Sequence, residues 1–278
     1  MDSSLQAIAS QWLDTAAARV LLPSLRIAMV FAMTPVLYAL PTPTRVRIIL
    51  ILALSWTLGQ ALPSTPSVAF PDFGDLLMAA IMEVAFGFVL ALGVYLAFAA
   101  FSVAGNLLDV QIGFGIAQVF DPVGNKAGPL LVSAFNYVAA VGFVLLDGHH
   151  ILLRALAYSF ELFPPGSDWS LAHASTPVFK QASGMFMLGF ALVAPVVFSI
   201  LLVEFVLGLI ARNLPQVNML VLGIPAKIVV GLMVLSLWFV GMGGAMNRVY
   251  MSIYDMWGAV FLGASYTEHP DANVGRTR

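Results

Sequence analysis

The sequence contains no cysteine and few charged side chains. Without cysteine the chain has no disulfide bond, no thiolate metal ligand and no cysteine nucleophile. Charged residues make up 9% of the 278 residues, whereas an average soluble domain has about 25%. A water-soluble globule of this size could not cover its surface with so few charges. A soluble enzyme, a secreted module and a disordered chain are therefore excluded.

Other absences narrow the function further. The net charge of -2 and the pI near 6.0 give no support for nucleic-acid binding. The first basic residue is Arg19, so we expect no cleavable signal peptide, which would begin with a basic region. The motifs HExxH, GxSxG, Walker A and GxGxxG are missing from the sequence. We therefore predict neither an enzymatic activity nor a cofactor.

Apolar residues, in contrast, make up 60% of the chain, and the mean hydropathy is +0.95. A helix that crosses the hydrocarbon core of a bilayer needs about 20 apolar residues. Six segments meet or approach this length. We predict an all-α membrane protein with about six long hydrophobic helices in antiparallel hairpins: 20–40, 45–62, 76–108, 129–146, 184–209 and 224–245.

Some segments fit this scheme imperfectly. The first contains Arg26 and two prolines, and the second is short. The third, at about 33 residues, would extend roughly 50 Å as a single helix, so it must tilt, kink or project from the membrane. Residues 1–19 and 151–162 have amphipathic patterns that predict helices at the membrane surface or docked on a partner.

The loop at 108–127 is apolar but contains three glycines and a proline. Non-helical backbone at membrane depth is tolerated only inside protein or along a cavity. We therefore expect this loop to fold into a protein-lined space, and an ordinary surface turn is the alternative. The candidate residues are Gln111, Gly113, Phe114, Gly115, Ile116, Val119, Phe120, Asp121 and Pro122.

A second loop is predicted at 211–227, bracketed by Pro215 and Pro225. Its amide side chains offer hydrogen bonds to a partner protein, although simple hairpin geometry would explain the prolines equally well. The candidate contact residues are Pro215, Gln216, Asn218, Gly223, Pro225 and Lys227.

Two carboxylates, Glu83 and Glu204, lie inside hydrophobic segments. A carboxylate at the centre of a spanning helix costs about 3 kcal/mol, so each should face protein or water as a buried polar group. Two functions are open: a proton or ion relay, and hydrogen bonding between helices or subunits. The adjacent His149 and His150 point about 100° apart on a helix, so we do not expect catalysis from them.

The stretch from Arg212 to Lys227 resembles the signature of the FliR family, which is related to the SctT component of type III secretion injectisomes. The first loop, with Gln111, Gly113, Gly115, Asp121 and Pro122, is similar to the same family. So is the sequence Asp147-Gly148-His149-His150. The three motifs occur in the family's order from about residue 18 to residue 257.

The resemblance implies a non-enzymatic subunit of the flagellar type III export gate, in the basal body and the bacterial inner membrane. FliP-like and FliQ-like subunits, together with an FlhB-like subunit, would be its partners, and unfolded flagellar proteins its substrates. Residues 20–183 would be FliP-like and 184–262 FliQ-like, whereas 263–278 lie outside the resemblance and are expected to form a flexible tail. The loop at 108–127 would plug the channel. An injectisome gate subunit and a proton-coupled small-solute transporter are the alternatives.

Overall fold

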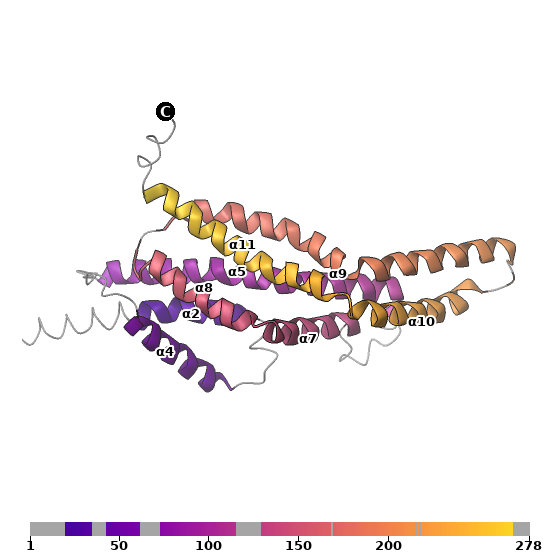
Figure 1. Cartoon of the computed structure of the whole chain (residues 1–278), viewed down its shortest axis with the longest axis horizontal. Helices are drawn as coiled ribbons and strands as arrows, with labels where there is room; N and C mark the ends of the chain where they lie inside the picture. Colours follow the sequence, from indigo (N-terminus) through magenta and orange to yellow (C-terminus); the bar gives the residue numbers. More distant parts are fainter. Residues whose placement is uncertain are drawn as a thin grey trace, which may run out of the picture. The chain divides into compact units, whose positions relative to one another are not determined.

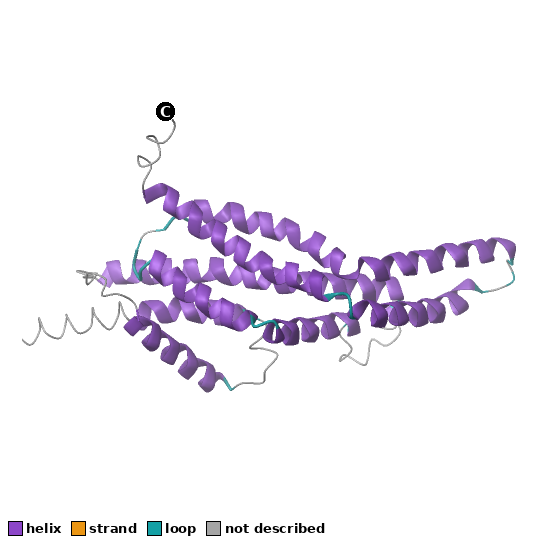
Figure 2. Cartoon of the chain, in the orientation of Figure 1, coloured by secondary structure: helices purple, strands orange, loops and turns teal. Residues whose placement is uncertain are grey.

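The computed structural model describes residues 20–34, 43–61, 73–114, 129–167, 169–214, 216 and 218–268. Every regular element in these ranges is a helix (Figures 1 and 2), which confirms the predicted all-α class. The helices are α2 (Leu22–Met33), α4 (Thr44–Ala61), α5 (Phe73–Ile112), α7 (Leu130–Leu145), α8 (Gly148–Leu162), α9 (Leu171–Asn213), α10 (Met219–Phe239) and α11 (Gly243–Glu268).

The chain divides into two compact units. Unit 1 contains residues 1–95, 146–181 and 253–278, and unit 2 contains residues 96–145 and 182–252. Each unit is therefore built from segments that are far apart in the sequence. The helices α5, α9 and α11 each contribute one end to unit 1 and the other end to unit 2.

Three helices of the described chain are long and apolar enough to cross a membrane. They are α5, α9 and the part of α10 from Val221 to Phe239. The helices α7 and α8 meet the same criterion only if they are taken together as one interrupted span. With 12 residues, α2 extends about 18 Å, which is too short to cross the hydrocarbon core. The described ranges thus give three or four candidate spans, fewer than the six predicted.

Two helices extend well beyond the predicted hydrophobic segments. The helix α5 has 40 residues and α9 has 43 residues. The prediction followed apolar residues only, so it missed polar helix ends such as residues 171–183, which contain His173, Lys180 and Gln181. A helix adds one backbone hydrogen bond for each further residue regardless of side-chain polarity, so a polar end can continue it.

The helix α11 was not predicted as a separate element. The predicted segment 224–245 is interrupted after Phe239 by a turn in which the Gly241 N–H donates to the Trp238 carbonyl, and α11 begins at Gly243. The helix continues to Glu268, so the first residues of the predicted flexible tail are helical. Residues 269–278 and the predicted N-terminal helix at 1–19 lie outside the described ranges.

Each unit has its own apolar core. In unit 1 the Trp257 side chain is buried against Gly93, and its indole N–H donates to the Leu90 carbonyl at 3.0 Å. In unit 2 the ring of Tyr250 packs against Phe101 and Phe143, with ring centroids 5.6 Å away in both cases. These aromatic contacts join segments that are distant in the sequence, which local periodicity does not reveal.

Candidate functional site

The end of α5 and the start of α7 are connected by one carboxylate in unit 2. Asp109 is buried, and its two oxygens accept hydrogen bonds from the backbone N–H groups of Leu131 at 3.1 Å and Val132 at 3.2 Å. The N–H groups in the first turn of a helix have no partner within the helix, and a negative charge there interacts favourably with the helix dipole. Asp109 therefore caps a helix that begins after the glycine loop.

A glycine allows the two helices to approach closely at the same point. A Cβ atom on Gly105, one turn before Asp109, would lie 2.5 Å from the Cα atom of Val132 and 2.9 Å from the carbonyl oxygen of Leu131. Both are backbone atoms, so they cannot move aside cheaply. We name Gly105, Asp109, Leu131 and Val132 the loop base, because they join the residues on either side of the loop.

Replacing Gly105 with alanine is expected to destabilise the loop base. Alanine favours a helix by about 1 kcal/mol over glycine, but overpacking costs about 1–3 kcal/mol, and here the clash is with backbone. We expect a lower thermal unfolding temperature for the detergent-solubilised protein. Gly208→Ala is the matched control, because a Cβ atom there meets nothing within 4 Å. Equal unfolding temperatures for both variants would contradict the close approach.

The loop begins where α5 meets α10 in unit 2. Gly113 has a φ angle of +99°, which favours glycine, and its N–H donates to the Asp109 carbonyl as α5 ends. The residue before Gly113, Ile112, has a buried side chain that packs against Gly231 of α10. A Cβ atom on Gly231 would lie 2.8 Å from the Cγ1 atom of Ile112. The start of the loop is therefore held by α7 on one side and α10 on the other.

The predicted start of the loop at residue 108 is wrong, because α5 continues to Ile112. Gln111 is consequently a helical residue rather than a loop residue, Gly113 is the turn residue that follows α5, and Phe114 is again in a helical conformation. The other candidate residues of this loop lie outside the described ranges: Gly115, Ile116, Val119, Phe120, Asp121 and Pro122. Their role as a plug stays a prediction.

The second loop is much shorter than predicted, because α9 ends at Asn213 and α10 begins at Met219. Gly223, Pro225 and Lys227 are consequently helical, and Pro225 lies inside α10. Proline removes one backbone hydrogen bond, but apolar helices tolerate this loss when neighbouring groups satisfy the freed carbonyl. Gln216 and Asn218 lie in the short loop with exposed side chains, and Pro215 is outside the described residues.

Glu204 of α9 and Lys227 of α10 form an ion pair across this hairpin in unit 2. The Glu204 side chain is 37% exposed and that of Lys227 is 25% exposed, so Glu204 is not buried in the isolated chain. An exposed ion pair in water contributes about 0–1 kcal/mol. In an otherwise apolar hairpin, the pair places a cation beside the carboxylate, so neither charge faces lipid without a counter-charge.

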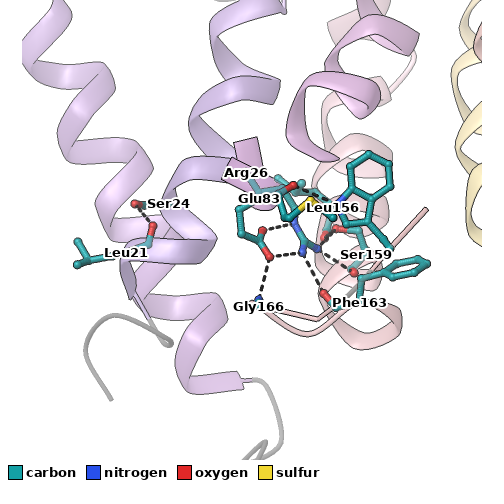
Figure 3. A network of polar contacts seen from close by, with 10 residues as sticks. Leu21, Ser24, Arg26, Glu83, Leu156, Ser159, Phe163 and Gly166 are labelled. Carbon is teal, nitrogen blue, oxygen red and sulfur yellow. Dashed lines mark hydrogen bonds and ion pairs between the residues drawn. The ribbon is translucent and has the colours of Figure 1, made fainter. Parts of the chain in front are cut away.

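Glu83 is buried in unit 1 and has a cation beside it. Arg26 is 2% exposed and Glu83 is 3% exposed. Figure 3 shows the two parallel hydrogen bonds: Nε of Arg26 donates to Oε2 of Glu83 at 2.8 Å, and Nη2 donates to Oε1 at 2.9 Å. This bidentate geometry joins α2 to α5, and charge-assisted pairs of this kind are among the stronger hydrogen bonds in proteins.

The remaining donors of Arg26 reach α8 and the segment after it (Figure 3). Nη1 donates to the carbonyl and hydroxyl oxygens of Ser159, Nη2 donates to the carbonyl oxygen of Phe163, and the N–H of Gly166 donates to Glu83. We name these five residues the buried arginine network. A buried ion pair is tolerated when further hydrogen bonds satisfy its remaining polar atoms, and this condition is met here.

Arg26 and Glu83 each stand out in the sequence, but the sequence does not predict their contact. They are 57 residues apart, so no local periodicity links them. The available signal was chemical: each is a lone charge in an apolar segment, and such charges usually pair. In this chain Glu83 therefore holds helices together, which matches the inter-helix interpretation of its role.

Comparison with known proteins gives the family. The sequence profile of the family "Bacterial export proteins, family 1" matches residues 17–253. The Flagellar biosynthetic protein FliR of Bacillus subtilis (strain 168) is 34% identical, over 77% of this chain and 83% of that protein. The protein of the same name from Pectobacterium carotovorum subsp. carotovorum is 28% identical, over 84% of this chain and 89% of that protein. The chain belongs to the FliR family.

Membership of the FliR family indicates the apparatus and the membrane to which this chain belongs. The chain is a component of the flagellar export apparatus and a multi-pass protein of the bacterial inner membrane, as the family and the apolar helices together indicate. The residues that match the bacterial export family, 17–253, include the loop base, the buried arginine network and the ion pair of the α9–α10 hairpin. Each of these features is therefore part of the region shared with the family.

Proposed function

We propose that this FliR-family protein is a structural subunit of the flagellar type III export gate, and that the loop after α5 closes the gate's channel. FliP-like, FliQ-like and FlhB-like subunits are its partners, and unfolded flagellar proteins pass through the assembly. The observation that carries the export role is the family match across residues 17–253. The matched relatives are named flagellar biosynthetic proteins, which favours the flagellum over an injectisome.

Exposed apolar side chains on the α9–α10 hairpin support the proposed assembly. Within unit 2, large apolar side chains of both helices are exposed in the isolated chain: Phe186, Phe190, Phe198, Phe205, Val229, Met233 and Leu237. Exposed apolar side chains in such number mark contact with lipid or with another protein. In our proposal this hairpin is the FliQ-like part, and its faces are shared between lipid and neighbouring subunits.

The loop base supports the closing role of the loop. Because Asp109 and Gly105 bind the start of α7, the two ends of the loop are fixed next to each other. In our proposal, the glycines of this sequence let the loop rearrange without moving the helices. An apolar loop in a narrow pore excludes water and ions by dewetting, and small local movement then opens the path.

The intramembrane carboxylates do not favour a proton-coupled transporter. Glu83 is fully engaged with Arg26, and Glu204 is paired with Lys227. Both contacts join helices within one unit, so they have a structural role without any transport cycle. The gate subunit is consequently the function that the side chains support best.

Affinity purification of the membrane-extracted protein tests this function. We expect the tagged chain, expressed with the FliP-like and FliQ-like proteins of the same bacterium, to purify with both in fixed ratios through size-exclusion chromatography. An unrelated tagged multi-span membrane protein in the same detergent is the control, and it should retain neither. A stable homodimer that excludes both proteins would contradict the proposal.

A further inference from the structure

Three possible metal ligands lie together at the start of α8 in unit 1. Asp147, His149 and His150 each offer one ligand atom, and these three atoms lie within 4.8 Å of one another. The imidazole centroids of the two histidines are 4.2 Å apart, although adjacent helical residues ordinarily point in different directions. The contacts already described for the gate subunit do not use this group.

The backbone turns the Asp147 carboxylate toward the histidines. Asp147 has a φ angle of +56°, and its carbonyl oxygen accepts the N–H groups of His150 and Ile151. Its side chain makes no capping hydrogen bond to the helix. The carboxylate oxygen Oδ1 instead lies 4.0 Å from Nδ1 of His150. The usual capping role of an aspartate therefore does not explain this side chain.

His149 supplies a second, independent observation. Its Nδ1 atom is buried and has no hydrogen-bond partner in the described part of the chain. Leaving such an atom without a partner costs about 1–3 kcal/mol. A bound cation would satisfy it, because a neutral imidazole nitrogen is a common metal ligand. The unpartnered nitrogen belongs to the same three-residue group.

A contact from α11 fixes the backbone between the ligands. The Tyr254 hydroxyl donates to the carbonyl oxygen of Gly148 at 3.1 Å. Burial raises the pKa of Tyr254 to about 12, so this phenol stays a neutral donor at physiological pH. Gly148 lies between Asp147 and His149, so this contact ties the backbone between the two ligands to α11.

We propose that Asp147, His149 and His150 bind one divalent transition-metal ion of the zinc, cobalt or nickel type. Two imidazole nitrogens and one carboxylate oxygen suit these metals, whereas magnesium and calcium favour oxygen ligands. Ligands at about 2.1 Å in a tetrahedral site lie roughly 3.4 Å apart, so the ligand atoms, which lie within 4.8 Å of one another, need to approach by at most about 1.4 Å to close around an ion. The ion would fix the first turn of α8.

Cobalt(II) titration of the full-length protein in detergent tests this site. The protein carries a tag without histidine, and visible absorption reports Co²⁺ binding to nitrogen and oxygen ligands. We expect one saturable Co²⁺ per chain, displaced by Zn²⁺, and a Zn²⁺-dependent rise in unfolding temperature. His150→Ala and Asp147→Asn should each weaken Co²⁺ binding by about tenfold or more, because each removes one ligand.

The control variants change the chain's other histidines, His173 and His269. His173 lies exposed on α9, and we expect His173→Ala and His269→Ala to bind Co²⁺ as tightly as the unmodified chain. The His150 side chain is largely exposed, so its variant should fold even if one at His149 does not. Absence of saturable binding, or binding that His150→Ala and Asp147→Asn leave unchanged, would overturn the proposal.

Discussion

Replacing Arg26 with alanine is expected to prevent the folded protein from accumulating in the membrane. The substitution leaves the Glu83 carboxylate buried at 3% exposure without its cation. Breaking a buried ion pair by removing one partner costs about 3–5 kcal/mol, a large part of the roughly 5–15 kcal/mol by which a typical protein is stable. The carbonyl groups of Ser159 and Phe163 also lose a donor. Quantitative immunoblotting of the membrane fraction measures the effect.

Matched variants separate the buried network from the general effect of removing an arginine. Arg154 lies exposed on α8 in the same unit, and Arg154→Ala should accumulate normally. The double variant Arg26→Met with Glu83→Met should recover much of the lost protein, because an apolar pair of similar volume needs no counter-charge. Normal accumulation of Arg26→Ala would show that the network is dispensable. If the double variant accumulates as poorly as Arg26→Ala, the two side chains have a role beyond pairing with each other.

The sequence predicted some helices closely because their limits coincide with changes in composition. Segment 45–62 corresponds to α4 (Thr44–Ala61), and segment 129–146 corresponds to α7 (Leu130–Leu145). Both begin immediately after a proline, which favours a helix start. The amphipathic stretch 151–162 likewise lies within α8, which ends before Pro164 and Pro165.

Other helix limits could not be derived from apolar runs. The hydropathy of segment 224–245 does not fall at its turn, because Val240 and Met242 on either side of Gly241 are apolar. Pro225 was taken as the end of a loop, yet it lies within α10. Both errors have one cause. The hydropathy of the side chains shows which residues avoid water, whereas the backbone hydrogen bonds determine where a helix ends.

The contacts of the candidate site were less predictable than the helices. Asp109 caps residues 22 and 23 positions further along the chain, and Arg26 pairs with a residue 57 positions away. Glycines gave a partial signal, since Gly105 and Gly231 mark close approaches but their partners are not encoded nearby. Only the fold brings these residues together. The sequence could therefore identify the charges and glycines that stand out in apolar segments, but not the residues they contact.

Deleting residues 113–120 is expected to leave the export gate assembled but leaky. The deletion keeps the loop base, because Gly105 and Asp109 precede it and Leu131 and Val132 follow it. The remaining residues 121–129 can extend about 30 Å, which is ample for two ends that Asp109 holds together. The apolar filling of the proposed channel is lost, so water and ions should enter a passage that was previously dewetted.

The measurement combines assembly with conductance. Size-exclusion chromatography should show the same complex for the deletion and the unmodified protein, and ion flux into vesicles containing each complex should rise at least tenfold for the deletion. A loop of unchanged length with Phe114→Leu and Phe120→Leu keeps the apolar filling and should stay closed. Because the loop base is present in all three proteins, a difference in flux reports the loop itself. Unchanged flux through an assembled complex without residues 113–120 would exclude the loop as the element that closes the channel.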